Sequence, residues 1–288
     1  MSAIHEGIKL TVGITGASGF VGRALITELQ RLGHQVRPIS LRGELAPDAL
    51  AGCTAIVHLA GEPVAQRWTP EARAKIERSR TEGTRALVNA MRQHRPQVLV
   101  SASAVGYYGN RGDKVLTESE PAASDFLGRV AKQWEEEALK AEDLGVRVAR
   151  IRIGMVLGRN GGALEKMLLP FKLGLGGPIG GGQQWMSWIH IDDLVALIVY
   201  LLIESTVRGV FNAVSPHPVT NAEFTKALGE AVHRPAFMPV PAFAVKLLFG
   251  EMSEVVLNSQ RAVPEAAIRA GFTFQYPEIY GALAHVVS

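Results

Sequence analysis

The sequence predicts an α/β protein with a doubly wound parallel sheet and a smaller C-terminal lobe, and three observations indicate this. Short apolar runs suited to buried strands alternate with amphipathic runs suited to helices, beginning with 10–14 and 24–32. A turn rich in glycine separates this first strand from the first helix. From Arg234 onward the composition shifts toward Pro, Phe and Met. We therefore expect one domain over residues 8–173 and a substrate-side lobe over 174–288, with later strands free to join the sheet.

Composition excludes several classes of protein. The 288 residues are 47% hydrophobic, which is ample for a packed core, and the 30 basic residues are scattered against 27 acidic ones. Scattered charge of this kind argues against a nucleic-acid partner. No apolar run reaches the roughly 18 residues that cross a membrane, and 1–9 lacks a secretory signal. With Cys53 as its single cysteine the chain forms no internal disulfide, so we expect a cytoplasmic protein with no membrane partner.

The first turn carries glycines three residues apart at Gly16, Gly19 and Gly22. A strand, this turn and a helix starting near Phe20 would aim free backbone N–H groups and the positive end of the helix dipole at one point. That arrangement suits a pyrophosphate, so we expect a dinucleotide site contacted by Gly16, Ala17, Ser18, Gly19, Phe20 and Val21. An ordinary glycine-rich turn is the alternative.

The second strand, over 35–40, decides which dinucleotide is expected. A carboxylate about 20 residues beyond the glycines would hold the ribose of NAD, whereas Arg there would hold the extra phosphate of NADP. This chain has Ser40 and Arg42, and no acid before Glu44. The pattern favours NADP(H) over NAD(H), unless Arg42 merely faces solvent.

The third strand is expected over 55–59. The connection before it, 44–53, is too short for a crossover helix, so one β–α unit is trimmed. His58 lies in an apolar run and is more often a core histidine with its hydrogen bonds satisfied than a ligand. The small residues at the strand end, Leu59, Ala60 and Gly61, would line the adenosine side of the cofactor.

The fourth strand, over 97–102, follows a long helix over 71–94. It ends at Ser101, Ala102 and Ser103, where open sheets of this kind place their ligands, so we expect these residues at the nicotinamide end of the cofactor. Ser103 is the leading polar candidate for an active site, and Tyr107 and Tyr108 follow on the next loop.

Later elements alternate in the same way. A helix over 125–143 precedes a strand over 146–153, whose end brings Arg152, Ile153 and Gly154 to the nicotinamide side. A further helix is expected over 162–171. A glycine-rich loop over 174–182 then leads to Trp185 and Trp188, and it either closes over a ligand or is a flexible crossover beside core tryptophans.

The last part of the chain predicts two more helices around a strand over 210–214. Asp192 is placed to cap a helix over 194–203, after His190. Thr220 and Glu223 have the spacing of a capping box for a helix that ends near Val232.

Several stretches together resemble the extended short-chain dehydrogenase/reductase superfamily, the group of nucleotide-sugar epimerases and dehydratases. They are 15–22, 58–61, 101–103 with 108–109, 151–154 with 157–158, and 188–193. More narrowly, 101–109, 168–177 and 251–260 look like its atypical, epimerase-like subgroup, whose members generally lack an assigned substrate. The resemblance implies a Rossmann domain, a nicotinamide cofactor and a possible homodimer. NADP-type members often have Arg directly after the position of Ser40, where this chain has Leu41.

The chain departs from the chemistry of that superfamily. The family reaction needs a Ser to hold the reacting oxygen, a Tyr to move the proton and a Lys four residues after the Tyr. Ser103 supplies the first, but none of the five tyrosines has a Lys four residues later. Tyr107, Tyr108 and Lys132 are the candidate replacements, with Trp185, Trp188 and His190 as candidate substrate contacts. The alternatives are packing for the tyrosines, solvent for Lys132 and a structural hydrogen bond for His190.

Two functions follow from this departure. The first is an NADP-dependent oxidoreductase or epimerase that acts on a small molecule through a different proton-transfer group. The second is a sensor or scaffold that binds the dinucleotide without turning it over, stabilised by the ligand. No metal is expected in either case. An open space lined by Ser103 beside the nicotinamide would favour the enzyme.

Overall fold

The computed structural model describes residues 9–159 and 161–288. The expected absence of a secretory signal concerns 1–9, and the expected domain start at Ile8 falls in the same segment. Apart from Lys9, these positions lie outside the described residues, as does Asn160 before the fourth predicted helix.

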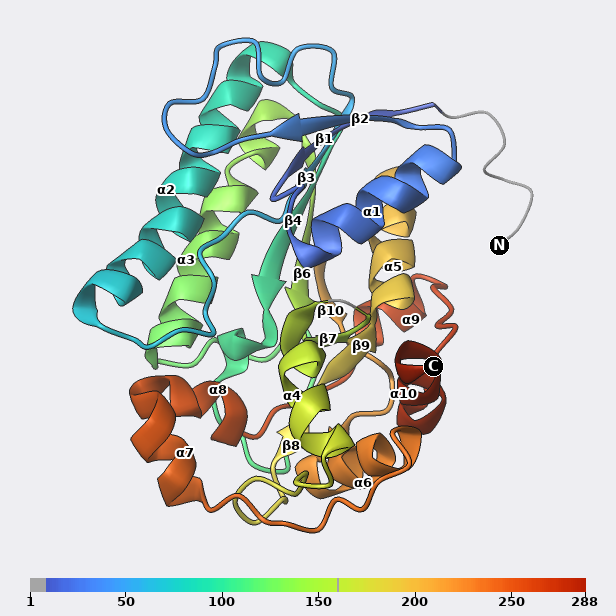
Figure 1. Ribbon diagram of the computed structural model, residues 1–288. Helices are drawn as coiled ribbons and strands as arrows, with labels where there is room; N and C mark the ends of the chain where they lie inside the picture. The colour runs from blue at the N-terminus through green and yellow to red at the C-terminus, as the bar shows by residue number, and fades with distance from the viewer. Residues whose placement is uncertain (1–8, 160) are drawn as a thin grey trace.

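A six-stranded parallel sheet forms the centre of the molecule (Figure 1). Its strand order is β10-β6-β4-β3-β1-β2. The strands are β1 (Thr11–Thr15), β2 (Gln35–Ile39), β3 (Ala55–His58), β4 (Val98–Ala104), β6 (Arg147–Ile153) and β10 (Gly209–Ala213). β10 comes from beyond residue 173 and extends the sheet at the β6 edge, as the sequence allowed.

Four helices cover the sheet, two on each face (Figure 1). α1 (Phe20–Arg31) and α5 (Ile191–Ile203) pack on one face, and α2 (Pro70–His94) and α3 (Phe126–Leu139) on the other. Residues 40–54 hold only turns and bends between β2 and β3, which confirms the trimmed crossover. The fold is thus the doubly wound α/β architecture that the alternating runs predict.

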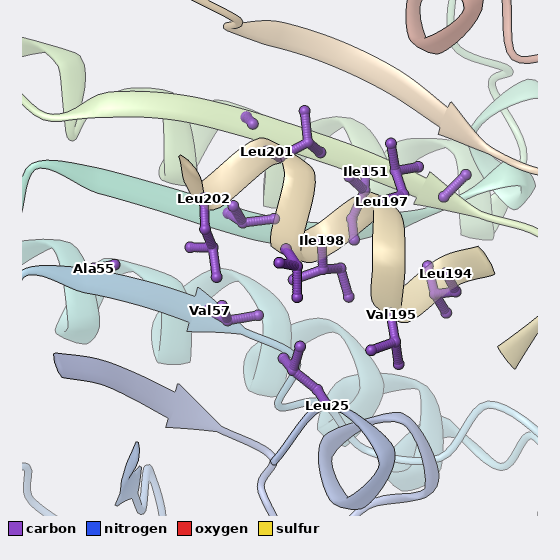
Figure 2. Packing of buried hydrophobic residues seen from close by; sticks show 14 of the residues in the cluster. Leu25, Ala55, Val57, Ile151, Leu194, Val195, Leu197, Ile198, Leu201 and Leu202 are labelled. Carbon is purple, nitrogen blue, oxygen red and sulfur yellow. The ribbon is translucent and has the colours of Figure 1, made fainter. Parts of the chain in front are cut away.

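The face under α1 and α5 is mainly apolar, with Arg147 at the start of β6 as a polar exception that donates to the carbonyls of Leu201 and Leu202 in α5. Alternate residues of the strands point toward it, among them Val57 and Ile151, and they meet Leu25 of α1 and Ile198 of α5 (Figure 2). Because α5 is pressed between the sheet and its neighbours, it is apolar on most sides. This layer holds the strand ends in a fixed register.

The opposite face changes character along the strands. Toward the amino ends it is apolar, with Ile56, Leu99 and Val148 against α2 and α3. Toward the carboxyl ends the residues of the same parity are buried polar groups: Thr15, His58, Ser101, Ser103 and Arg152. We call this end of the sheet the carboxyl edge, and it positions the candidate site.

Most of the remaining elements gather beyond the carboxyl edge (Figure 1). Trp188, Phe224 and Leu283 anchor a separate apolar cluster there. Those beyond this edge are β5 (Val115–Leu116), β7 (Met155–Leu157), α4 (Gly162–Lys172), β8 (Trp185–Met186), β9 (Trp188–His190), β11 (Val219–Thr220), α6 (Asn221–Ala231), α7 (Ala242–Phe249), α8 (Glu254–Leu257), β12 (Arg261–Ala262) and α10 (Ile279–Val287), with 3-10 turns η2 (Val105–Tyr108) and η4 (Gly250–Ser253). Two elements lie elsewhere: α9 (Glu265–Arg269) packs against β10, and the 3-10 turn η3 (Glu142–Leu144) connects α3 to the amino end of β6.

Two of the predicted helix caps have different outcomes. Thr220 caps α6 as predicted, since its hydroxyl accepts from the Glu223 N–H at 3.2 Å. The prediction for Asp192 is wrong: α5 begins at Ile191, and the cap is the His190 ring, whose Nδ1 accepts from the Asp192 N–H at 3.1 Å. The helix starts earlier than expected because His190 is extended and directly precedes it.

None of the helices in the described part of the chain is long and apolar enough to span a membrane.

Candidate functional site

The glycine turn has the geometry that binds phosphate. Gly16 has φ +71°, a conformation that favours glycine, and any Cβ there would lie 2.8 Å from the Leu59 backbone. Gly22 has no room for a side chain against the Gly16 carbonyl. Gly19 caps α1 with no side-chain hydrogen bond, so the first amides of the helix keep their hydrogen-bonding capacity for a ligand. The turn, the start of α1 and the end of β3 therefore meet at one point.

The exit of β2 leaves a cation at the surface. Ser40 Oγ accepts from the Arg42 N–H at 3.2 Å and shapes the turn. The Arg42 side chain is exposed, and within 9–159 and 161–288 its guanidinium has no hydrogen-bond or ion-pair partner. It is available for a phosphate, and equally for solvent.

His58 is the satisfied core histidine that the sequence favoured. Its ring is fully buried, with Nδ1 2.6 Å from Thr15 Oγ1 and Nε2 2.9 Å from Thr84 Oγ1. Burial, and secondarily the charge of Arg80, lowers the pKa of His58 to about 4. The ring is therefore neutral and structural.

Arg80 of α2 is a residue at this edge that sequence reasoning missed. Its guanidinium lies against Gly61 and donates from Nη1 to the Glu62 carbonyl at 3.0 Å, with the Trp134 ring 5.1 Å away. Burial lowers the pKa of Arg80 to about 10, although the charge of Glu62 opposes the shift. α2 carries several arginines, and no spacing in the sequence distinguishes this one from those that face solvent.

A buried polar network joins the ends of β4 and β6 to α3. Ser103 Oγ donates to Glu135 Oε1 at 2.7 Å, and Arg152 holds both carboxylate oxygens, Nε to Oε1 at 2.8 Å and Nη2 to Oε2 at 3.0 Å. The three residues are only 3–4% exposed. Burial alone would lower the pKa of Arg152, but its hydrogen bonds to Glu135 and the charge of that carboxylate raise it above the ordinary value.

The two tyrosines of η2 have different surroundings. Tyr108 is fully buried, and its hydroxyl lies 2.8 Å from Arg152 Nη1, 2.7 Å from Asn212 Oδ1 and 3.1 Å from the Thr117 carbonyl. Burial raises the pKa of Tyr108 to about 12. Tyr107 is half-buried, with the Arg152 guanidinium carbon 3.4 Å from its ring centroid. Its hydroxyl has no hydrogen-bond partner among the residues that the structure describes.

Other predicted site residues lie outside this network. Lys132 is 60% exposed on α3, with Nζ 3.8 Å from Glu136. Trp185 Nε1 donates to Asp113 Oδ1 at 2.9 Å, whereas Trp188 is fully buried in the apolar cluster and donates to the His217 carbonyl at 3.1 Å. His190 stacks on Tyr276 with ring centroids 3.9 Å apart. The structure does not bring these four side chains together with Ser103.

Two members of the network were not predicted. Glu135 opens a run of three glutamates, a pattern typical of a solvated helix face, yet its carboxylate points at Ser103. Asn212 pairs with Tyr108 only because β10 lies beside β6 in the sheet. The run of glutamates wrongly suggests a solvated residue, and the role of Asn212 can be recognised only once the strand order is known.

The glycine-rich loop is tied to the segment before α7. The Val240 N–H donates to the Pro178 carbonyl at 2.9 Å, and the Gly180 N–H donates to the Val240 carbonyl at 2.8 Å. A cavity of about 650 Å³ opens between this loop and the 242–258 segment, with Asn110 and Gln184 at its wall. The loop is a tethered crossover that walls a cavity.

Comparison with known proteins decides the family. The model of the NAD dependent epimerase/dehydratase family matches residues 12–213, from β1 through β10. The chain belongs to this family. A second model, a domain of unknown function designated DUF1731, matches residues 240–286, which include α7 through most of α10.

Relatives in this family are similar over nearly the whole chain. The chloroplastic SDR39U1 homolog of Arabidopsis thaliana is 42% identical and is aligned over 97% of this chain and 87% of its own length. The mouse epimerase family protein SDR39U1 is 37% identical, over 97% of this chain and all of that protein.

Solved structures show the same fold. Human SDR39U1, crystallised with NADPH, superposes with a TM-score of 0.90 at 35% identity and covers 96% of this chain and 99% of that one. MoeE5, solved with UDP-glucose and NAD, superposes with a TM-score of 0.80 at 22% identity, over 96% of this chain and 97% of that one, which shows the fold alone.

Proposed function

We propose that this family member is an NADP(H)-dependent oxidoreductase or epimerase that acts on a small molecule at the carboxyl edge. The observation that carries the proposal is that the phosphate-binding turn at the start of α1 and the Ser103, Glu135 and Arg152 network lie on the same edge of one sheet. A dinucleotide that spans this edge has its phosphates at α1 and its reactive ring toward β4 and β6. Phosphate binding and polar chemistry are therefore joined by one extended ligand.

The cofactor assignment rests on the exit of β2. Arg42 supplies an exposed guanidinium that has no partner among the described residues, and β2 lies next to the strand that carries the glycine turn. A free guanidinium suits a 2′-phosphate better than a ribose hydroxyl. The NADPH in the structure of the human relative supports this choice.

A second candidate function is a scaffold or sensor that binds the dinucleotide without turning it over. One observation favours it: Ser103 is only 3% exposed, and its proton is donated to Glu135. An open space lined by Ser103 is expected of an enzyme, but the side chain of Ser103 is buried instead. We retain the enzyme as the main proposal because Tyr107, beside the same network, has a hydroxyl that donates to no group in the described part of the chain.

Titration of the purified protein with NADPH, NADH, NADP⁺ and NAD⁺, followed by fluorescence and thermal shift, tests the proposal. We expect tighter binding of the phosphorylated forms, and exchange of bound NADPH within minutes. A nucleotide that co-purifies and neither exchanges nor becomes oxidised would establish the scaffold instead. No binding of any of the four would contradict both functions.

A further inference from the structure

Reduction of a carbonyl requires a proton donor for the new alcohol oxygen. Three hydroxyls at the carboxyl edge are candidates: Ser103, Tyr107 and Tyr108. Ser103 is the expected oxygen-holding residue, but its proton is committed to Glu135, a carboxylate that only accepts. Toward a ligand the Ser103 hydroxyl is thus an acceptor. Another group at this edge must supply the proton.

Tyr108 does not meet this need. Its hydroxyl has one proton, which is shared between Asn212 Oδ1 at 2.7 Å and the Thr117 carbonyl at 3.1 Å, while Arg152 donates to its oxygen. The side chain is also fully buried. A ligand that took this proton would leave Asn212 Oδ1 without its donor from Tyr108 inside the protein.

Tyr107 has both properties that a proton donor needs here, an accessible hydroxyl and an uncommitted proton. The side chain is half-buried, so its hydroxyl is within reach of solvent and ligand, and in the described chain that hydroxyl donates to no protein group. Its ring packs against the Arg152 guanidinium, which donates to the Glu135 carboxylate. Ser103 donates to the same carboxylate. Tyr107 and Ser103 therefore flank the same Arg152–Glu135 pair.

We propose that Tyr107 is the catalytic proton donor that replaces the absent Tyr-x-x-x-Lys pair; this inference rests on the proposed NADP(H) function. When bound, NADPH supplies the hydride to the carbonyl carbon. As the carbonyl π electrons move to oxygen, the O–H bond of Tyr107 breaks and its proton passes to that oxygen. The products are an alcohol, NADP⁺ and a Tyr107 phenolate, which regains a proton from solvent. Alcohol oxidation runs through the same steps in reverse.

Arg152 and Glu135 act as positioning residues in this scheme. The bidentate ion pair fixes the guanidinium plane against which the Tyr107 ring packs, and it fixes Ser103 through one carboxylate oxygen. Because a carbonyl oxygen only accepts hydrogen bonds, the Tyr107 hydroxyl rather than Ser103 would hold and protonate the reacting oxygen.

The neighbouring tyrosines provide a matched pair of variants. We expect Tyr107→Phe to keep the thermal midpoint and the NADPH affinity of the wild type, and to lower the rate of NADPH oxidation with small aldehydes and ketones by about 10²- to 10⁴-fold. Tyr108→Phe should lower the thermal midpoint, because it removes a buried hydrogen-bond donor to Asn212. Wild-type rates in Tyr107→Phe would overturn the assignment.

A second readout does not depend on turnover. Tetranitromethane should nitrate Tyr107 and spare Tyr108, as mapped by mass spectrometry, and NADPH with a carbonyl compound should slow nitration of Tyr107 but not of the exposed Tyr280. Unchanged nitration of Tyr107 would overturn the proposal, as would a wild type that binds NADPH yet reduces none of the compounds. Failure to bind NADPH at all would instead contradict the proposed function itself.

Discussion

At the scale of single residues, a mutation in the buried Arg152–Glu135 ion pair should lower the stability of the fold strongly. Both side chains are nearly inaccessible to water, and the carboxylate accepts three hydrogen bonds from Ser103 and Arg152. Removing one partner of such a pair leaves the other charge buried and uncompensated, which is far more costly than losing a surface ion pair.

Glu135→Gln is therefore expected to lower the free energy of unfolding by about 3 kcal/mol. The amide keeps the shape of the side chain but loses the charge that faces Arg152 and one of the two acceptor oxygens. Urea denaturation measures the effect, and Glu136→Gln, at the exposed neighbouring position, is the control that should change little. Equal stability of the two variants would contradict the electrostatic account of this network.

The Arg42→Asp variant tests cofactor choice. Replacing the free guanidinium with a carboxylate sets a like charge against the 2′-phosphate, so we expect NADPH affinity to fall far more than NADH affinity. Fluorescence titration gives both constants. Arg208→Asp makes the same charge change before the amino end of β10, at the opposite edge of the sheet, and should leave the ratio unchanged. A parallel loss of both cofactors in Arg42→Asp would remove the phosphate assignment.

The sequence predicts the turn at Gly16 because each of its requirements is local: a strand, a helix start and glycines at fixed spacing. It does not predict the Glu135 network, whose members come from β4, α3 and β6 and meet only through strand order. Glu135 even carries the opposite signal, since a run of acids on a helix is usually solvated. Local patterns thus locate the turn that we propose binds phosphate, whereas the polar network beside it depends on tertiary structure.

At the scale of elements, a histidine pair ties the C-terminal helix α10 to the start of α5. His190 Nδ1 accepts from the Asp192 N–H, so Nε2 carries the ring proton and donates to His285 Nδ1 at 3.0 Å. Although these two histidines and Asp192 are close enough to hold a metal ion, this pattern leaves His190 with no lone pair for one. Tyr276 stacks on both rings. Nδ1 of the exposed His285 is therefore the acceptor that ties α10 to the start of α5.

Loss of this acceptor should therefore loosen α10 before the sheet. His285→Phe keeps an aromatic ring beside Tyr276 but offers no acceptor to His190 Nε2. We expect amide exchange in α10, measured by mass spectrometry and corrected for intrinsic rates, to rise by roughly 2- to 10-fold relative to β4. His217→Asn, at the exposed partner of Glu278, should leave this ratio unchanged. Wild-type exchange of α10 in His285→Phe would show that the histidine pair does not hold the helix.

At the scale of the whole molecule, the fold responds to pH through its buried histidines. The His58 ring connects β1 of the central sheet to α2, whereas the His190 ring connects the start of α5 to α10. Burial is the main cause that lowers the pKa of each to about 4, from an ordinary value of about 6.5. Each ring is thus folded in its neutral form.

The sign of the effect follows from linkage. Because the folded pKa is depressed, the unfolded chain binds protons first as pH falls, so the stability that these rings contribute is complete above about pH 6.5 and is lost as pH falls to 4. Each ring accounts for a loss of up to about 3 kcal/mol over this range. Urea denaturation at pH 7.5, 6 and 5 should show a steady fall, and His58→Gln, which keeps a neutral polar side chain between Thr15 and Thr84, should make that fall less steep, with His190 responsible for what remains. An unaltered slope in that variant would mean that acid acts on the fold through other groups, and that the neutral His58 ring at the carboxyl edge contributes no pH-dependent stability.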